Sequence, residues 1–329
     1  MIRIGIDAMG GDNAPKEIVK GAILATKLNK ELSLTLVGDE EKINCVLDEQ
    51  KADRSHIEVV HATEVIEGDD QPVKAIRRKK DSSLVVMMNL LKEGKVDAVV
   101  SAGNTGALLA GGIFIAGRIE GVSRPAITGI YPSLNPTVIL DIGANADVSP
   151  EHLVEFAKMG SIFAKIAFKK DDIKVGLINI GTEETKGNEL VKKAYPLLKE
   201  TQEISFYGNV EARDIPKGIV DVAVCDGFTG NTILKLTEGL AETIFAMMKE
   251  VVYSSTKAKM GALLMKDSLK GMKDSLNYEE VGGAVLLGVD GVVVKAHGSS
   301  NAKAFSNAIL RAAEYHHSGL IAHIKEVIS

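Results

Sequence analysis

The sequence predicts a three-layer α/β/α protein built on a largely parallel sheet. Short runs rich in β-branched residues alternate with longer amphipathic stretches along most of the 329 residues. This alternation is typical of parallel strands that are covered on both faces by helices. The sequence has no internal repeat and no polar linker that would divide it, so we expect a single α/β domain over residues 1–329.

Each expected strand is a short apolar run, and each expected helix is a longer run with apolar residues at helical spacing. Strands are expected at residues 3–6, 34–37, 57–60, 98–100, 137–140, 175–179, 204–207, 220–224 and 292–295. Helices are expected at residues 14–28, 83–93, 107–119, 150–168, 188–200, 229–253 and 300–327. A helical excursion at about 240–280 is expected to protrude as a helix pair.

The composition argues against several classes of protein. The formal net charge is −5, whereas nucleic-acid-binding domains are typically basic. The sequence has no Trp and only 4% aromatic residues, which leaves few rings for stacking on bases. We therefore expect no nucleic-acid partner.

The cysteines and the first residues of the sequence indicate the cellular compartment in which the protein works. Cys45 and Cys225 are far apart and form no CxxC pair, which argues against a disulfide framework or a cysteine zinc site. The start of the sequence reads as a strand and a turn rather than as a signal peptide. The longest nearly uncharged apolar run, residues 106–117, is too short to span a bilayer of about 30 Å. We expect a cytoplasmic protein.

Five of the expected strands are followed by turns rich in glycine and small polar residues. In a parallel sheet such turns lie at the carboxyl ends of the strands, where these folds bind ligands. Glycine lets the backbone approach an anion, and the next helix directs N–H groups at it. One such turn would indicate no more than a helix cap, but five favour a phosphate or a phosphorylated ligand. The turns lie at residues 7–13, 101–106, 141–145, 179–183 and 226–231.

The usual signatures of nucleotide and metal sites are missing from the sequence. It contains no GxxxxGK[ST] motif, and its first turn reads AMGGDNAP rather than GxGxxG. It also contains no HExxH motif, no GxSxG motif and no carboxylate cluster arranged for a metal. We expect no cofactor and no metal, and chemistry that depends on lysines, amides, hydroxyls and a histidine.

Three side chains near the ends of the expected strands have alternative interpretations. Lys186 is a candidate phosphate ligand, or a solvated loop lysine. His297 is a candidate proton donor to a leaving group, or a residue that packs at a helix start. Asp7 is expected to cap the first helix, or else to orient a catalytic lysine. Cys225 ends an apolar run without an obvious base, so we expect a buried structural thiol rather than a nucleophile.

Amide and hydroxyl groups complete the candidate site. The pairs Asn104 with Thr105, and Thr229 with Asn231, are candidate donors to an oxyanion, although each pair could be satisfied by its own turn. The candidate catalytic residues are Lys186, His297 and Asn231. The candidate phosphate- or substrate-binding residues are Gly10, Gly11, Asn13, Asn104, Thr105, Gly181, Thr182, Asn188, Thr229, Gly230 and Ser299.

Taken together, these motifs resemble the PlsX-type acyl-ACP:phosphate acyltransferases of bacterial phospholipid synthesis. The resemblance covers essentially the whole chain, and motifs of this length in this order are highly specific. They read IGIDAMGGDNAPKEIVKGA, HATEVI, PVKAIRRKKDSS, SAGNTGALLAGG, LDIGAN, PEHLVEFAKMGS, IGTEETKGNEL, GNVEARD, CDGFTGN and KAHGSS.

The resemblance implies the reversible reaction of acyl-ACP with inorganic phosphate, which gives acyl phosphate and free acyl carrier protein. The acyl phosphate would serve a membrane glycerol-3-phosphate acyltransferase of the PlsY type. The family's fold is similar to the isocitrate/isopropylmalate dehydrogenase and phosphotransacetylase architecture. Its members are homodimers that associate peripherally with the cell membrane, so the same is expected here.

This chemistry suits direct attack of bound phosphate on the thioester, without an acyl-enzyme. A thiol with a pKa near about 8.5 is already a good leaving group, and positioning can contribute roughly 7–11 kcal/mol. In this scheme Lys186 binds phosphate and His297 assists the departing thiolate. The donors to phosphate or to the oxyanion are Asn104, Thr105, Thr229 and Asn231.

Two surfaces are candidates for the partners. Residues 74–80 carry five positive charges, and Arg77, Arg78, Lys79 and Lys80 form a candidate docking patch for the acidic carrier protein, or else a solvated helix end. Residues 260–265 form an apolar tip beside lysines, with Leu263, Leu264 and Met265 as candidate membrane contacts. Met265 also begins a helical stripe with Leu269, Met272 and Leu276. A dimer contact is the alternative for this tip.

Two other functions remain open at this stage. A metal- and NAD-dependent decarboxylating dehydrogenase could use the same fold, but the sequence lacks an arginine-rich hydroxy-acid site and clustered metal aspartates. A non-catalytic scaffold for lipid synthesis could use residues 253–276, but it would leave the glycine turns without a purpose.

Overall fold

The computed structural model describes residues 1–132, 135–265 and 283–328 of the chain. Its strands form one eleven-stranded sheet in the order β3-β2-β1-β4-β11-β10-β5-β6-β9-β7-β8. The strands are β1 (Ile2–Asp7), β2 (Leu32–Gly38), β3 (Ile57–His61), β4 (Ala98–Ser101), β5 (Ala126–Tyr131), β6 (Thr137–Leu140), β7 (Lys174–Asn179), β8 (Ser205–Glu211), β9 (Val222–Val224), β10 (Ala284–Leu287) and β11 (Val292–Lys295).

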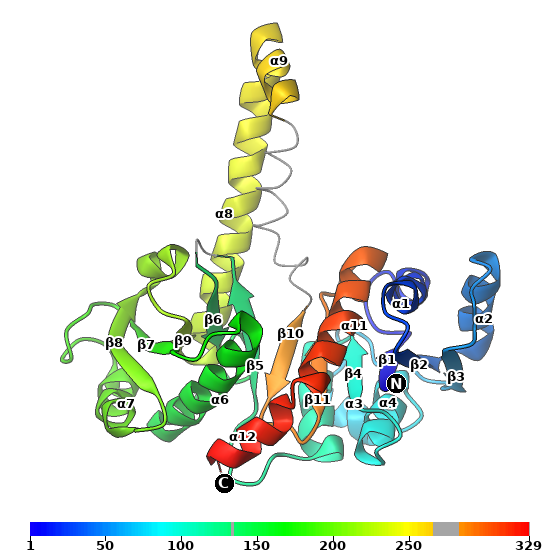
Figure 1. Ribbon diagram of the computed structural model, residues 1–329, viewed down its shortest axis with the longest axis horizontal. Coiled ribbons are helices and arrows are strands. Elements are labelled where there is room, and N and C mark those ends of the chain that lie inside the picture. Colours follow the sequence, from blue (N-terminus) through cyan, green and yellow to red (C-terminus); the bar gives the residue numbers. More distant parts are fainter. Residues whose placement is uncertain (133–134, 266–282, 329) are drawn as a thin grey trace.

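Helices cover both faces of this sheet (Figure 1). In chain order the described helical segments are α1 (Lys16–Leu28), α2 (Glu40–Glu49), α3 (Pro72–Arg78), α4 (Ser83–Lys92), α5 (Thr105–Gly111), the π-helical turn η1 (Gly112–Ala116), α6 (Pro150–Phe168), α7 (Glu189–Glu200), the 3-10 turn η2 (Ala212–Lys217), α8 (Gly227–Tyr253), α9 (Thr256–Leu264), α11 (Ala302–His317) and α12 (Leu320–Ile328).

The core consists of two apolar clusters, one on each face of the sheet. Successive strand residues point to opposite faces, so Val292 and Val294 belong to one cluster and Val293 to the other. Helices α1, α2, α6, α7, α11 and α12 cover the first face. Helices α3, α4, α5 and the start of α8 cover the second, which we call the α8 face. The predicted three-layer α/β/α architecture is confirmed.

The sheet consists of two parallel blocks that run in opposite directions. Strands β3, β2, β1, β4 and β11 pair in parallel, and so do β6, β9, β7 and β8. Between the blocks, β10 is antiparallel to β11 and β5, and β5 is antiparallel to β6. The strands of the two blocks therefore end at opposite edges of the sheet, so the five glycine turns do not all follow strands that end at the same edge.

Some predicted elements also need correction. Strands β5 and β10 and helices α2 and α3 were not predicted. The predicted last helix, residues 300–327, is two helices, because Gly319 adopts a left-handed φ of +69° between α11 and α12. The predicted helix over 150–168 agrees with α6 at both ends.

Helix α8 begins in the core and then projects far beyond the sheet (Figure 1). Its 27 residues span about 40 Å at about 1.5 Å per residue. Gly227, Gly230 and Leu234 are buried at its base, whereas the distal part is largely exposed. Helix α9 lies at the tip. The rest of the predicted excursion, including Leu269, Met272 and Leu276, lies outside the described residues. Among the described helices, none combines the length and the apolar composition needed to cross a membrane.

Candidate functional site

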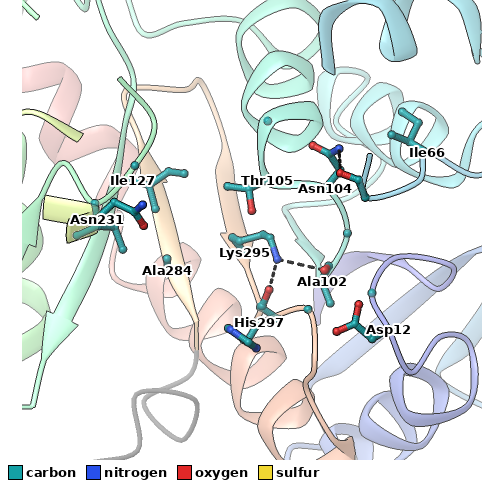
Figure 2. A pocket seen from close by; sticks show the side chains of 18 of the residues that line it. Asp12, Ile66, Ala102, Asn104, Thr105, Ile127, Asn231, Ala284, Lys295 and His297 are labelled. Atoms are coloured by element: carbon teal, nitrogen blue, oxygen red, sulfur yellow. Dashed lines mark hydrogen bonds between the residues drawn. The ribbon is translucent and has the colours of Figure 1, made fainter. Parts of the chain in front are cut away.

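A cavity of about 860 Å³ lies on the α8 face, between α5 of the first block and α8 of the second. It crosses the short strands β10 and β5, where the blocks meet (Figure 2). Its lining combines turns, apolar side chains and charged side chains: Met9, Gly11, Asp12, Ile66, Glu67, Gly68, Ala102, Gly103, Asn104, Thr105, Gly106, Ile127, Ile142, Gly143, Asn231, Leu234, Lys235, Glu238, Ala284, Lys295, Ala296, His297 and Gly298.

One wall is built by three turns that follow the neighbouring strands β1, β4 and β11. They pack too closely for side chains: a Cβ at Gly10 would lie 2.8 Å from the backbone nitrogen of Gly103. Gly11 has a φ of +100°, and a Cβ there would lie 3.0 Å from the carbonyl oxygen of Gly298. The backbone N–H of Asp12 donates to that same oxygen at 2.8 Å. The first and last parts of the sequence are thereby joined at the cavity.

Lys295 is the feature of this wall that sequence reasoning missed. Its Nζ donates to the carbonyl oxygen of Ala102 at 3.1 Å and to that of Ala296 (Figure 2). Burial lowers the pKa of Lys295 to about 8, although the nearby carboxylates of Asp7 and Asp12 act to raise it. The signal was present in the sequence: a single lysine ends the buried apolar strand β11 at its carboxyl end.

Asp7 lies at the end of β1 and is almost fully buried, with 2% of its surface exposed. Its carboxylate accepts hydrogen bonds from the hydroxyls of Ser83, at 2.6 Å, and Ser101, at 2.7 Å. Burial raises the pKa of Asp7 despite these bonds. Helix α1 is preceded by Pro15 and has no side-chain cap, so the expectation that Asp7 caps it is wrong. The alternative, orientation of a lysine, agrees with the proximity of Lys295.

Asn104 and Thr105 line the cavity at the start of α5, as the sequence led us to expect of substrate-binding residues. The Asn104 Oδ1 accepts from the backbone N–H of Ala107 at 2.9 Å. Its Nδ2 donates to the carbonyl oxygens of Glu67 and Gly68. Asn104 therefore caps α5 and holds the loop before α3 against the cavity.

The opposite wall is formed by the second block. Asn231 and Leu234 come from α8, and Ile142 and Gly143 follow β6. At the rim, Lys235 forms an ion pair with Glu238 at 2.8 Å. Ile127, Ile142 and Leu234 contribute apolar side chains to this part of the cavity.

His297 lines the cavity beside Lys295. Its Nδ1 lies 2.8 Å from the Ser299 hydroxyl and accepts from the Ser299 backbone N–H at 3.2 Å. The side chain of Asn13 donates to the carbonyl oxygen of Ser299 at 3.0 Å. Asn13 and Ser299 therefore fix the turn that carries His297. Of the residues predicted for the site, the cavity brings together Gly11, Asn104, Thr105, Asn231 and His297, while Gly10, Asn13 and Ser299 belong to the same turns without lining it.

The remaining predicted residues lie outside this cavity. A second, mostly apolar cavity of about 570 Å³ lies at the carboxyl ends of β7 and β9, and Asn188 and Thr229 line it. The Asn188 Oδ1 caps α7, and the Thr229 hydroxyl donates to Asp226. Lys186 lies exposed on the loop between β7 and α7, together with Gly181 and Thr182. None of these residues lines the first cavity, so the phosphate-binding role of Lys186 stays a prediction.

Asp141 and Cys225 hold the start of α8 in place. The buried Asp141 carboxylate accepts from the backbone N–H groups of Gly143, Ala144 and Asn145, and burial raises its pKa. Burial also raises the pKa of the Cys225 thiol well above its usual value. Cys225 is thus a buried structural thiol, as expected. Over the described residues, no group of three His, Cys, Asp or Glu side chains could hold a metal ion.

Comparison with solved structures shows which fold the chain adopts. The structure is similar to a phosphotransacetylase from Streptococcus pyogenes, with a TM-score of 0.64 and 16% identity over 96% of this chain and 94% of that one. It is also similar to a branched-chain phosphotransacylase from Enterococcus faecalis V583, with a TM-score of 0.58 and 13% identity over 96% and 99% of the two chains. The predicted phosphotransacetylase-like architecture is confirmed.

Sequence comparisons then identify the family. A family model described as "Fatty acid synthesis protein" matches residues 2–323. A phosphate acyltransferase of Alkaliphilus oremlandii is 51% identical over 100% of this chain and 98% of its own. One of Clostridioides difficile is 48% identical over 100% and 96%. The chain therefore belongs to the PlsX family of phosphate acyltransferases and is an acyltransferase.

Proposed function

We propose that the chain transfers a fatty acyl group from the thioester of acyl carrier protein to inorganic phosphate. The acyl phosphate would then pass to a membrane glycerol-3-phosphate acyltransferase for phospholipid synthesis. Relatives at 48% and 51% identity over the whole chain, both called phosphate acyltransferase, support the acyl acceptor. The description of the family as a fatty acid synthesis protein supports a fatty acyl donor.

One observation carries this proposal: a single cavity combines a lysine ammonium group and amide side chains with several apolar side chains. The polar part suits an anion, and the apolar part suits the chain of an acyl group. The dehydrogenase alternative receives no comparable support, since the relatives at 48% and 51% identity are called phosphate acyltransferase.

In the proposed step a phosphate oxygen attacks the thioester carbonyl carbon. The new C–O bond forms, the C–S bond breaks, and the carrier thiolate takes up a proton to become a free thiol. Asn231 and Thr105 are suited to donate to the oxyanion from opposite walls of the cavity, and His297 to deliver the proton. The reaction needs positioning more than a strong base.

The experiment incubates the purified chain with palmitoyl-ACP and phosphate, and traps acyl phosphate with hydroxylamine. Product that requires phosphate supports the proposal. Folded protein that gives none, but binds vesicles and carrier protein, would favour the scaffold instead. The Lys186→Ala variant in the same assay tests whether the loop lysine takes part in the reaction.

We also propose a docking site for the carrier protein on α3. The loop before α3 lines the cavity, α3 packs against α5, and Lys79 at the basic end of α3 contacts Val65 at the start of that loop. Arg77, Arg78 and Lys80 are exposed, whereas Lys79 is engaged with Asp70 and the carbonyl oxygen of Val65. Charge reversal at Arg77 and Arg78 should raise the KM for acyl-ACP. Reversal of exposed Lys193 on α7 should leave that KM unchanged.

The projecting helices α8 and α9 offer surfaces for two further partners, a second copy of the chain and the membrane. Along α8, exposed apolar side chains recur on one stripe: Leu236, Leu240, Ile244, Met247 and Val251. A second copy of the chain would bury this stripe in a homodimer, and Leu240→Glu should shift the mass in solution to that of a monomer.

At the tip, Leu263 is 71%, Leu264 89% and Met265 55% exposed. Beside Lys257 and Lys259 they suit peripheral binding to an anionic membrane.

A further inference from the structure

We propose that Lys295 is the residue that binds the oxoanion in the cavity, so that phosphate lies at the carboxyl end of β11 when it reacts. The inference rests on the proposed function for the identity of the oxoanion as substrate. The presence of an anion site at Lys295 stands on the geometry alone.

The pairing of β11 in the sheet fixes the position of Lys295. Strand β11 pairs with β4 and β10, so Lys295 lies between Ser101 and Ala284 at the edge of the first block. The carbonyl oxygens of Ala102 and Ala296 fix the ammonium group inside the cavity. An ammonium group has three N–H donors, and those two carbonyls account for two. The third is suited to an oxygen of a bound anion.

The surroundings of Lys295 suit a small, oxygen-rich ligand. Four glycines line this part of the cavity, and their lack of side chains lets an anion approach the backbone and the ammonium group together. The glycines are Gly11, Gly103, Gly106 and Gly298.

Among the charged side chains around the cavity, Lys295 is the one best placed to bind an anion. The Lys235 ammonium is paired with Glu238 at the rim. The groups that line the cavity around Lys295 are Asp12 from the first turn, Glu67 from the loop before α3, and His297 from the turn after β11, while Asp7 faces it from β1. Among the described lining residues, Lys295 is thus the lysine without a side-chain ion pair in the cavity wall. An anion would offset the cost of keeping its charge buried.

The site has a built-in dependence on pH. Because burial lowers the pKa of Lys295 to about 8, the ammonium form is lost as the pH rises above that value. The neutral amine no longer attracts an anion, so affinity should fall about tenfold for each pH unit above the pKa. By linkage, a bound anion raises the pKa of Lys295 in return.

The test measures binding of sulfate to the full chain by calorimetry at pH 7 and pH 9.5. Sulfate is the probe because, unlike phosphate, it does not titrate in this range. We expect wild-type affinity to fall about 30-fold between the two pH values, as a pKa of about 8 requires. Lys295→Met should bind sulfate at least 30-fold more weakly than wild type already at pH 7. Lys295→Arg should keep binding and lose the pH dependence, because arginine stays charged.

A matched control uses Lys158, a partly buried lysine on α6 that is paired with Glu203 outside the cavity. Lys158→Met should bind sulfate within twofold of wild type. Wild-type affinity that stays constant from pH 7 to pH 9.5, or Lys295→Met affinity within twofold of wild type, overturns the inference. Should Lys295→Met fail to fold, the pH series of wild type and Lys295→Arg decides.

The phosphate assay separates this inference from the proposed function. If wild type makes acyl phosphate and folded Lys295→Met keeps its phosphate KM, the function stands and Lys295 is not the ligand. If wild type makes no acyl phosphate but sulfate binding depends on Lys295, the anion site stands and the proposed function fails.

Discussion

Gly230 of α8 packs directly against the backbone carbonyl of Asp141 at the end of β6, with no room for a Cβ atom between them. One turn earlier, a Cβ at Gly227 would lie 2.7 Å from the carbonyl oxygen of Asn145. These two contacts fix the direction in which α8 leaves the sheet. They also fix the position of Asn231, the next residue, in the cavity wall.

A Gly230→Ala substitution should therefore destabilise the protein. The methyl group can be accommodated only if α8 moves away from β6, so we expect a loss of about 3 kcal/mol in the free energy of unfolding, measured by urea denaturation. Gly239, also in α8, has open space around it. Gly239→Ala should be neutral or stabilise by up to about 1 kcal/mol. Equal stability of the two variants would contradict this account of the helix start.

Lys295→Met should make the protein more stable at pH 7 while it removes anion binding. The pKa of lysine is about 10.4 in an unfolded chain and about 8 at Lys295 in the folded protein. Between these values the unfolded chain binds more protons, so wild-type stability rises with pH in that window.

We expect the variant's advantage to shrink by about 2 kcal/mol between pH 7 and pH 9.5, as the pKa of about 8 requires. Thermal and urea denaturation of both proteins at the two pH values measure it. A wild type that is more stable than Lys295→Met at pH 7 would mean that attraction to Asp7 outweighs the cost of burial.

Asn231→Ala should lower kcat by about 10²–10³ without a matching loss of stability, because a donor to a developing oxyanion is lost from an exposed helix position. Single-turnover kinetics with acyl-ACP measure the chemical step. Asn44→Ala on α2, whose side chain accepts from Arg54 far from the cavity, is the control and should keep kcat. An unchanged rate for Asn231→Ala would remove this residue from the mechanism.

Leu264→Glu should weaken binding to vesicles that contain anionic lipid. Leu264 is 89% exposed at the tip of the projection, and burial of a leucine contributes about 1.5–3 kcal/mol. We expect the affinity for these vesicles to fall at least tenfold in a sedimentation assay, while turnover of acyl-ACP in solution is retained. Leu28→Glu, also at an exposed apolar residue but away from the tip, should bind like wild type. Vesicle binding that is unaffected by Leu264→Glu would rule out the tip as the contact.

The sequence predicted the elements of each parallel block well, because buried strands and amphipathic helices have distinct periodicities. It did not predict the reversal between the blocks. Strand direction depends on β5 and β10, two short strands that pair across 157 residues through Thr128 and Val285. A local pattern carries no information on such a pairing, so two turns predicted to share one edge can lie at opposite edges.

The candidate site was predicted to a similar extent. Turns after β1, β4 and β11, and the start of α8, supplied Gly11, Asn104, His297 and Asn231. Lys295 was missed because a lysine at a strand end usually reaches solvent, and only the packing of the neighbouring turns buries it. The loop with Lys186 follows β7, a strand of the second block, and does not line the first cavity. The sequence of the loop alone could not show to which block its strand belongs.

The most direct test of the central claim is the stoichiometry of one reaction. The chain is incubated with palmitoyl-ACP and ³²P-labelled phosphate, and free carrier thiol and labelled, solvent-extractable acyl phosphate are measured in the same samples. Acyl transfer to phosphate predicts one labelled phosphate in the product for each thiol released, and no thiol release without phosphate. Thiol release that proceeds without phosphate, or without label in the acyl product, would contradict the account and indicate hydrolysis instead.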